Sequence, residues 1–326
     1  MQDPADAQTH PALREANLNL GFALVQQRKF REAIPVLLSA RMPGDRGVND
    51  ALMVSVLSLL QHEPAGRAAG PFDLAPLGAD PLVSVVIPTR DRPGMLRDAL
   101  LSVGGQTYGS WEAIVVNDGG AKPSIPEELA AKVVYFEFGA PQGVARARNA
   151  GLRAARGAVV AFLDDDDIYL PRHLETLVGA LRESGAALAY TRSVGVEERI
   201  EEHTRHELRR GLPYEYQYAR ALLLVRNLIP TANWGVRREC FERCGGFDEG
   251  LACAEDWDML LRLSAVAPFH LVAAITAQIR VRSGVPDNVT RRIPLRPTCE
   301  LLYRRYPDEG SELIALGRRI YLESVA

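Results

Sequence analysis

Four consecutive aspartates, Asp164 to Asp167, directly follow the apolar run 158–163. A short apolar run bounded by turn residues is typical of a buried strand, so the carboxylates are expected at its carboxyl end, where open α/β sheets bind ligands. Neighbouring like charges raise one another's pKa unless a cation joins them. Mg²⁺ prefers oxygen ligands and is often held by one or two carboxylates together with substrate phosphates. The motif therefore indicates a metal that carries a diphosphate; the alternative is a solvated acidic turn or a helix cap.

Two further polar clusters are expected along the same edge of a sheet. The apolar run from Leu82 ends in residues 88–92, Pro-Thr-Arg-Asp-Arg, and the run 111–116 is followed by Asn-Asp-Gly-Gly at 117–120. An acidic residue after a second strand can accept hydrogen bonds from a ribose or a base, although all four residues of the second cluster also favour a plain turn. No glycine-rich dinucleotide motif or Walker-type motif is present, which argues against those two kinds of site.

Composition narrows the class of protein. The chain has 326 residues, 47% of them hydrophobic, and a formal net charge of −3, so we expect a globular protein without the basic field that nucleic-acid binding requires. Its 4 cysteines show neither zinc-site spacing nor a disulfide framework. No signal-like start and no membrane-length apolar run is present. These features predict a cytoplasmic protein, with peripheral attachment at the inner membrane surface as the alternative.

The order of patterns along the chain predicts its organisation. Residues 1–62 have apolar residues at helical spacing, with two helices meeting at 27–29, and 63–81 read as a linker rich in Pro, Gly and Ala. Strands alternating with helices then predict an α/β domain over 82–290, with a mostly parallel sheet covered by helices on both faces, and 291–326 form a helical extension. The strands are expected at 82–88, 111–116, 133–136 and 158–163, and the helices at 95–103 and 143–156.

Four segments together resemble glycosyltransferase family 2, which has the GT-A fold. They are residues 83–89, 115–119, 143–151 (Gly-Val-Ala-Arg-Ala-Arg-Asn-Ala-Gly) and 162–167, in the family's order and approximate spacing, within a similarity that covers about 82–288. The first helices also resemble one tetratricopeptide repeat. The family resemblance implies a nucleoside-diphosphate sugar donor, most often a UDP- or dTDP-sugar, and a divalent cation, Mg²⁺ or Mn²⁺.

The resemblance also implies roles for individual residues. Asp166 would hold the metal, with Asp165 as a rival because the run of four aspartates leaves the register open by one. The donor nucleotide would lie near a set of residues from the strand ends and the following helix: Pro88, Thr89, Asp91, Asp118, Arg148, Asp164 and Asp165.

Asp256, in Ala254-Glu255-Asp256-Trp257-Asp258, matches the family's general base. A carboxylate within hydrogen-bond reach can take the acceptor hydroxyl's proton as it attacks. The alternative is a helix start whose acidic residues complement the macrodipole, with Asp258 paired to Arg262; both can hold. An acceptor or diphosphate role is implied for Trp234, whose alternative is core packing, for Glu255, and for Arg282, which replaces a histidine common in relatives and can grip a diphosphate.

The resulting hypothesis is a metal-dependent, inverting, hexosyltransferase-type enzyme of glycan or cell-surface polysaccharide synthesis. Its acceptor hydroxyl would belong to a glycan, a lipid-linked glycan or a protein. A nucleotidyltransferase is an alternative that lacks the basic glycine-rich loop expected after the first strand. A second alternative is a non-catalytic scaffold with a degenerate sugar-nucleotide domain. The N-terminal helices would bind a protein partner, self-associate, or merely cover apolar surface.

Overall fold

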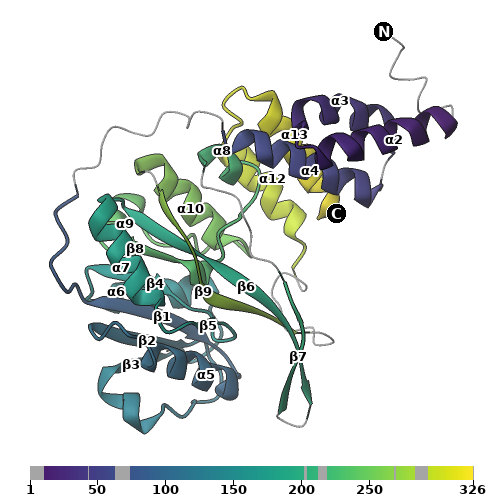
Figure 1. The fold of residues 1–326 in the computed structure, drawn as a ribbon. Helices are drawn as coiled ribbons and strands as arrows, with labels where there is room; N and C mark the ends of the chain where they lie inside the picture. The colour runs from purple at the N-terminus through teal and green to yellow at the C-terminus, as the bar shows by residue number, and fades with distance from the viewer. Residues whose placement is uncertain are drawn as a thin grey trace. The chain divides into compact units, whose positions relative to one another are not determined.

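The structure, a computed structural model, describes residues 11–42, 44–62, 74–201, 204–211, 219–267, 269–282 and 293–325. The chain divides into two compact units (Figure 1). The first takes Met1–Gly66, Tyr216–Leu228 and Pro294–Ala326, and the second takes Arg67–Glu215 and Ile229–Ile293. Most of the predicted linker, 63–73, and the predicted domain end at residue 290 lie outside the described residues, so those boundaries stay predictions.

The first unit is helical throughout its described residues, which confirms the predicted helices at both ends of the chain. Glycine lets α2 approach α3 closely: a Cβ on Gly21 would stand 2.5 Å from Leu37 Cδ2. The side chain of Asp45 caps α4 by accepting a hydrogen bond from the Val48 amide at 3.3 Å. The helices are α2 (Pro11–Gln26), α3 (Phe30–Ala40), α4 (Arg46–Leu60), α8 (Arg220–Leu223), α12 (Leu295–Arg305) and α13 (Glu312–Ser324).

The second unit is built on one mixed sheet with the strand order β3-β2-β1-β4-β8-β6-β9-β5, and β7 pairs with β6. Its first half is parallel, as the sequence predicted. Because β1 is buried along its whole length, its sequence is predominantly apolar rather than alternating. The parallel strands are β1 (Val83–Thr89), β2 (Trp111–Asn117), β3 (Val133–Glu137) and β4 (Val159–Phe162).

Side chains of β1 alternate between the two faces of the sheet, and each face has its own helices. Val85 and Ile87 belong to the core cluster that contains Leu96 and Leu100 of α5 and Leu177 of α7. On the opposite face α6 packs against β1 and β2. The covering helices are α5 (Pro93–Gly104), α6 (Val144–Ala154), α7 (His173–Ser184), α9 (Cys240–Cys244) and α10 (Glu255–Val266). The expected α/β architecture with helices on both faces is confirmed.

The second half of the sheet is largely antiparallel and was not predicted. Strand β8 pairs antiparallel with β4 and with β6, while β6 and β9 run parallel over a long stretch. Arg237 is the last residue of β8, which pairs with the start of β4, and α9 begins only at Cys240. These strands are β5 (Ile168–Tyr169), β6 (Leu188–Glu201), β7 (Thr204–Arg210), β8 (Trp234–Arg237) and β9 (Phe269–Arg282).

Among the described residues, no helix combines the length and the apolar character that crossing a bilayer requires.

Candidate active site

The parallel register brings three polar clusters to one edge of the sheet. Thr89, the last residue of β1, is paired with Asn117, the last residue of β2. On the other side of β1, Val86 pairs with Phe162, the last residue of β4, just before the aspartates. The carboxyl ends of β1, β2 and β4 are therefore neighbours, which is where open α/β sheets bind ligands.

The cluster after β2 forms a turn that holds the loop before α6. The side chain of Asn117 accepts a hydrogen bond from the Gly120 amide at 3.1 Å. The buried Asp118 carboxylate accepts two more, from the amides of Gln142 at 2.6 Å and Gly143 at 3.0 Å. Asp118 thus fixes the loop at the start of α6. Its predicted contact with a nucleotide stays a prediction and would use the remaining lone pairs of the same carboxylate.

The cluster after β1 reaches both of its neighbours. Pro88 lies buried inside the strand, while the Thr89 hydroxyl donates to the Asp165 carboxylate at 2.7 Å. Asp91 is exposed, has a positive φ of 54°, and accepts a hydrogen bond from the Ala121 amide at 2.9 Å. A non-glycine residue rarely adopts this backbone conformation. The hydrogen bond to the Ala121 amide places the Asp91 carboxylate against the loop after β2.

The four aspartates have different surroundings. Asp164 accepts from Arg148 Nη2 at 2.6 Å, and its side chain is 32% exposed. Asp165 is buried and also accepts from Arg92 Nη1 at 3.0 Å. Asp166 accepts from Arg92 and from Arg282, and the buried Asp167 carboxylate accepts from the Arg280 amide at 2.9 Å. The run does form a tight turn, in which the Asp167 amide donates to the Asp164 carbonyl at 3.0 Å, but two of its carboxylates are buried, so it is not a solvated turn. The helix-cap interpretation does not fit, because α7 begins only at His173.

Burial dominates the electrostatics of this run. It raises the pKa of Asp165 to about 6, against the opposing effect of the Arg92 charge. It also raises the pKa of Asp166, with the charge of Asp164 as the next cause, and raises that of Asp167 well above its ordinary value. Burial and the neighbouring carboxylates thus both disfavour the charged forms of these aspartates, and the nearby arginines oppose this effect.

The residues present are compatible with a divalent cation at Asp166. Its side chain is 16% exposed, whereas that of Asp165 is 5% exposed, although both carboxylates already accept from arginine side chains. No group of three or more acidic, histidine or cysteine side chains is placed to hold a metal within the described ranges. A cation here would therefore depend on one or two carboxylates, with phosphate oxygens and water completing its coordination.

Arg148, on α6, joins the aspartate run to a distant helix. Its side chain is only 4% exposed, and its two terminal nitrogens bind Asp164 and Glu255, the first residue of α10. Burial by itself lowers the pKa of Arg148, but the charges of Asp164 and Glu255 outweigh it and raise the pKa. The end of β4 and the start of α10 consequently lie within the span of one guanidinium group.

The next residue of α6 holds the loop that leads to α10. Asn149 donates to the Phe247 carbonyl at 2.9 Å and accepts from the Phe247 amide at 2.7 Å. A Cβ on Gly246 would collide with the Asn149 side chain, which explains the glycine in the Gly-Gly-Phe-Asp turn. Two adjacent residues of α6 thus position the start of α10.

Asp256, in the first turn of α10, is the expected base. Its carboxylate accepts from the Thr231 hydroxyl at 3.3 Å and from the Trp257 amide at 2.8 Å. Burial raises its pKa to about 6, the Glu255 charge adds to the rise, and the Arg148 charge opposes it. A carboxylate with this pKa is ionised at neutral pH yet is a stronger base than an ordinary aspartate. The helix-start interpretation also holds, because Asp258 is fully buried and paired to Arg262 at 2.8 Å.

Comparison with known proteins shows which family the chain belongs to. The family model "Glycosyl transferase family 2" matches residues 84–245. The uncharacterized glycosyltransferase YwdF of Bacillus subtilis is 30% identical over 185 residues, an alignment that covers 55% of this chain and 67% of YwdF. The chain belongs to glycosyltransferase family 2.

Other relatives are larger than this glycosyltransferase family 2 chain. The O-antigen biosynthesis protein RfbC of Myxococcus xanthus is 29% identical over 279 residues, which is 81% of this chain and 21% of RfbC. The chain spans 35% of an uncharacterized glycosyltransferase of Rickettsia felis.

Solved structures resemble the chain in fold. The mannosyltransferase PcManGT of Pyrobaculum calidifontis, in complex with GDP-Man and Mn²⁺, has a TM-score of 0.55 at 16% identity, and the alignment covers 85% of this chain and 82% of the PcManGT chain.

A second solved structure supports the same fold. TarS 1-349 of S. aureus, in complex with UDP-GlcNAc, has a TM-score of 0.53 at 18% identity and covers 73% of this chain and 70% of its own. At these identities the likeness concerns the fold, which is GT-A-like, as the family resemblance implied.

Trp234 does not have the surroundings that an acceptor-binding role needs. The indole of this family 2 chain is fully buried, with its ring centroid 4.9 Å from that of Phe162. It therefore has no exposed face on which a sugar ring can stack, and the alternative interpretation, core packing, is the one that the structure shows.

Two contributors to the family 2 site were not predicted. Arg92 binds both Asp165 and Asp166, and Thr231 donates to Asp256. Arg92 lies in the polar segment that follows β1, so its sequence position was a usable signal. Thr231 had none, because its neighbour Asp256 is 25 residues further along the chain.

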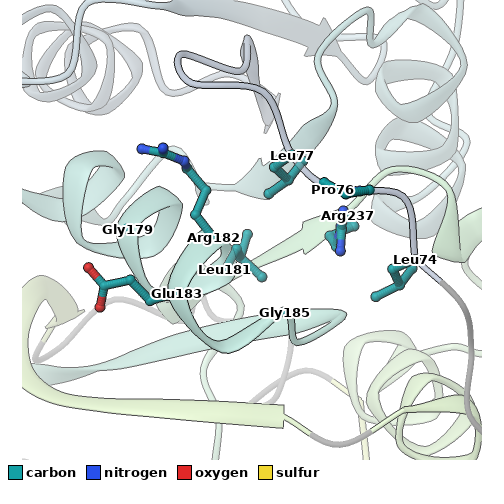
Figure 2. A pocket seen from close by; sticks show the side chains of 9 residues that line it. All are labelled: Leu74, Pro76, Leu77, Gly179, Leu181, Arg182, Glu183, Gly185 and Arg237. Atoms are coloured by element: carbon teal, nitrogen blue, oxygen red, sulfur yellow. The ribbon is translucent and has the colours of Figure 1, made fainter.

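A cavity of about 630 Å³ lies elsewhere in the second unit (Figure 2). Its lining includes Leu74 and Leu77, Arg182 of α7 and Arg237 of β8, with Arg237 beside Pro76. Arg237 pairs with Val159 at the start of β4, whereas the aspartates follow the opposite end of that strand. None of the predicted site residues lines this cavity.

Proposed function

We propose that this family 2 protein transfers a sugar from a nucleoside-diphosphate sugar to an acceptor hydroxyl, with inversion at the anomeric carbon. The observation that carries the proposal is the bridge made by Arg148. This guanidinium binds Asp164 at the expected donor edge and Glu255 beside the expected base. An acceptor next to Asp256 would therefore be within reach of a donor held at the strand ends, as a direct displacement requires.

The reaction proposed is a single displacement. The acceptor oxygen forms a bond to the anomeric carbon while its proton passes to the Asp256 carboxylate. The bond from that carbon to the diphosphate breaks, and its electron pair leaves with the nucleoside diphosphate. Attack opposite the leaving group inverts the configuration. A divalent cation at Asp166, with Asp164 beside it, would supply charge neutralisation for the departing diphosphate.

For the donor we propose a UDP- or dTDP-hexose, bound near Thr89, Asp91 and Asp118. Family membership and the structural neighbours' nucleotide-sugar complexes support a sugar nucleotide. The acceptor class we propose is a glycan, free or lipid-linked, of a cell-surface polysaccharide, with a protein hydroxyl as the alternative. The name of the relative RfbC supports the polysaccharide assignment.

For the domain organisation we propose that residues 82–290 perform the transfer and that 1–62 and 291–326 form a helical accessory module. Leu20 and Phe22 of α2 are 51% and 37% exposed, which supports a role in self-association or partner binding.

Calorimetry and a turnover assay test this proposal. A panel of UDP-, dTDP- and GDP-sugars is titrated with and without Mn²⁺, and release of nucleoside diphosphate is then followed for any donor that binds. We expect one donor class to bind in a cation-dependent manner and to be hydrolysed slowly without an acceptor. A protein that binds a donor but releases no nucleoside diphosphate above background, with any acceptor, would instead be a scaffold. A protein that releases pyrophosphate from a nucleoside triphosphate would be a nucleotidyltransferase.

A further inference from the structure

One oxygen of Asp166 is shared by two arginines from different parts of the chain. Arg92, just before α5, places Nη1 3.2 Å from Asp166 Oδ2, and Arg282, the last residue of β9, places Nη2 2.6 Å from the same atom. The three side chains are 23%, 3% and 16% exposed for Arg92, Arg282 and Asp166. The carboxylate expected to hold a cation is thus already neutralised by the protein itself.

This arrangement opposes the binding of a free cation. A divalent cation at Asp166 would have to approach Oδ2 while two guanidinium groups remain in contact with it, and repulsion between like charges is strong where little water screens it. Arg282 cannot join the cation as a ligand, because a guanidinium group has donors and no acceptor. A neutral side chain at this position would not oppose the cation in this way.

A diphosphate has the opposite effect on the same groups. Its oxygens match the planar fork of a guanidinium group, which binds phosphates through paired, charge-assisted hydrogen bonds. Arg92 and Arg282 would gain a phosphate group as a partner in place of Asp166. Asp166 Oδ2 would then become free for a cation that also contacts the diphosphate.

We propose that Arg92 and Arg282 exchange partners, from Asp166 in the free protein to the donor diphosphate in the complex, so that the cation binds Asp166 only together with the diphosphate. This inference rests on the proposed function and adds to it the coupling between the two ligands. Thermodynamic linkage makes the coupling reciprocal: the diphosphate strengthens cation binding by the same factor by which the cation strengthens diphosphate binding.

The distinguishing test is a single substitution with opposite effects on two ligands. Arg282→Gln removes one guanidinium from Asp166, so Mn²⁺ alone should bind about tenfold or more tighter than to the wild type, while UDP in the presence of Mn²⁺ should bind about tenfold or more weaker. Isothermal calorimetry measures both. Arg280→Gln is the matched control, because Arg280 lies on the same strand and its side chain is directed to Asp98 at 3.5 Å; neither affinity should change.

Two additional variants make the outcome decisive. Arg92→Gln should likewise strengthen the binding of Mn²⁺ alone and weaken the binding of UDP with Mn²⁺. It serves as the test if Arg282→Gln does not fold. Asp166→Ala added to Arg282→Gln should abolish the gain in Mn²⁺ affinity. The inference is overturned if Mn²⁺ alone binds the wild type as tightly as the variant, or if the substitution weakens both ligands together. If no UDP, dTDP or GDP binds the wild type under any condition, the proposed function fails, and the titration with Mn²⁺ alone still decides whether the arginines oppose the cation.

Discussion

Replacing Arg148 with methionine removes the guanidinium group that binds both Asp164 and Glu255, and the cost in stability can be worked from the burial of these two carboxylates. The side chain of Glu255 is 9% exposed, so loss of the Arg148 guanidinium leaves the buried Glu255 charge without this compensating partner. Removing one partner of a buried ion pair typically costs about 3–5 kcal/mol. Asp164, at 32% exposed, adds little because water can solvate it. We therefore expect the free energy of unfolding to fall by about 3–5 kcal/mol, measured by denaturant titration.

The same substitution should change the pH dependence of transfer. Asp256 must be ionised to accept a proton, so activity falls as pH decreases through its pKa, which is about 6. The Arg148 charge lowers this pKa, and removing it therefore moves the acid limb to higher pH. The assay is kcat/KM against pH with a saturating nucleotide sugar.

Two companion variants separate charge from folding. Arg148→Lys retains one positive charge and should move the acid limb less than methionine does. The double variant Arg148→Met/Glu255→Gln removes the uncompensated carboxylate, so it should be more stable than Arg148→Met alone. Glu255→Gln alone should move the acid limb to lower pH, because the Glu255 charge raises the pKa of Asp256. A folded Arg148→Met protein with an unchanged acid limb would refute the electrostatic link between Arg148 and Asp256.

Three other substitutions test individual roles. Asp256→Asn should lower transfer by about 10²–10⁴-fold while donor affinity, measured by calorimetry, stays within a few fold; equal loss of both would contradict the assignment as base. Asp166→Ala should remove the part of donor affinity that depends on the cation, and an unchanged binding isotherm with and without Mn²⁺ would rule that role out. Trp234→Ala should lower the free energy of unfolding by about 3–5 kcal/mol through lost core packing. A selective rise in acceptor KM without loss of stability would show instead that Trp234 contacts the acceptor.

The parallel half of the sheet was predictable because its strands are buried on both faces. Such strands are predominantly apolar runs between polar turns, as in 83–89 and 111–117, and the structure confirms them. The antiparallel half was missed for the converse reason. Strand β9 mixes buried and exposed positions without strict alternation, and β6 ends in a charged segment, so neither has a strand-like hydrophobic period.

The position of the site on the sheet was predictable, but the ion pairs between its residues were not. Strand ends placed Asp118 and the aspartate run on one edge, since parallel strands share a direction. The ion pairs there join residues far apart in the chain: Arg92 and Asp165 are separated by 73 positions, and Arg148 and Glu255 by 107. A single sequence has no local pattern that reports such contacts, and they depend on how the sheet brings β4, α6 and α10 together.

The helical unit is assembled from three separate stretches of the chain, and this affects how the protein can be shortened. Val225, from the middle stretch, is fully buried, and a Cβ on Gly317 of α13 would lie about 3 Å from both Val225 and Val56 of α4. The first, middle and last stretches thus share one interior. Deleting residues 1–62 to isolate a minimal transferase would strip the cover from the apolar surface of the other two. The middle stretch lies between parts of the second unit in the sequence, so a trimmed version must redesign that insertion instead of merely cutting at the ends.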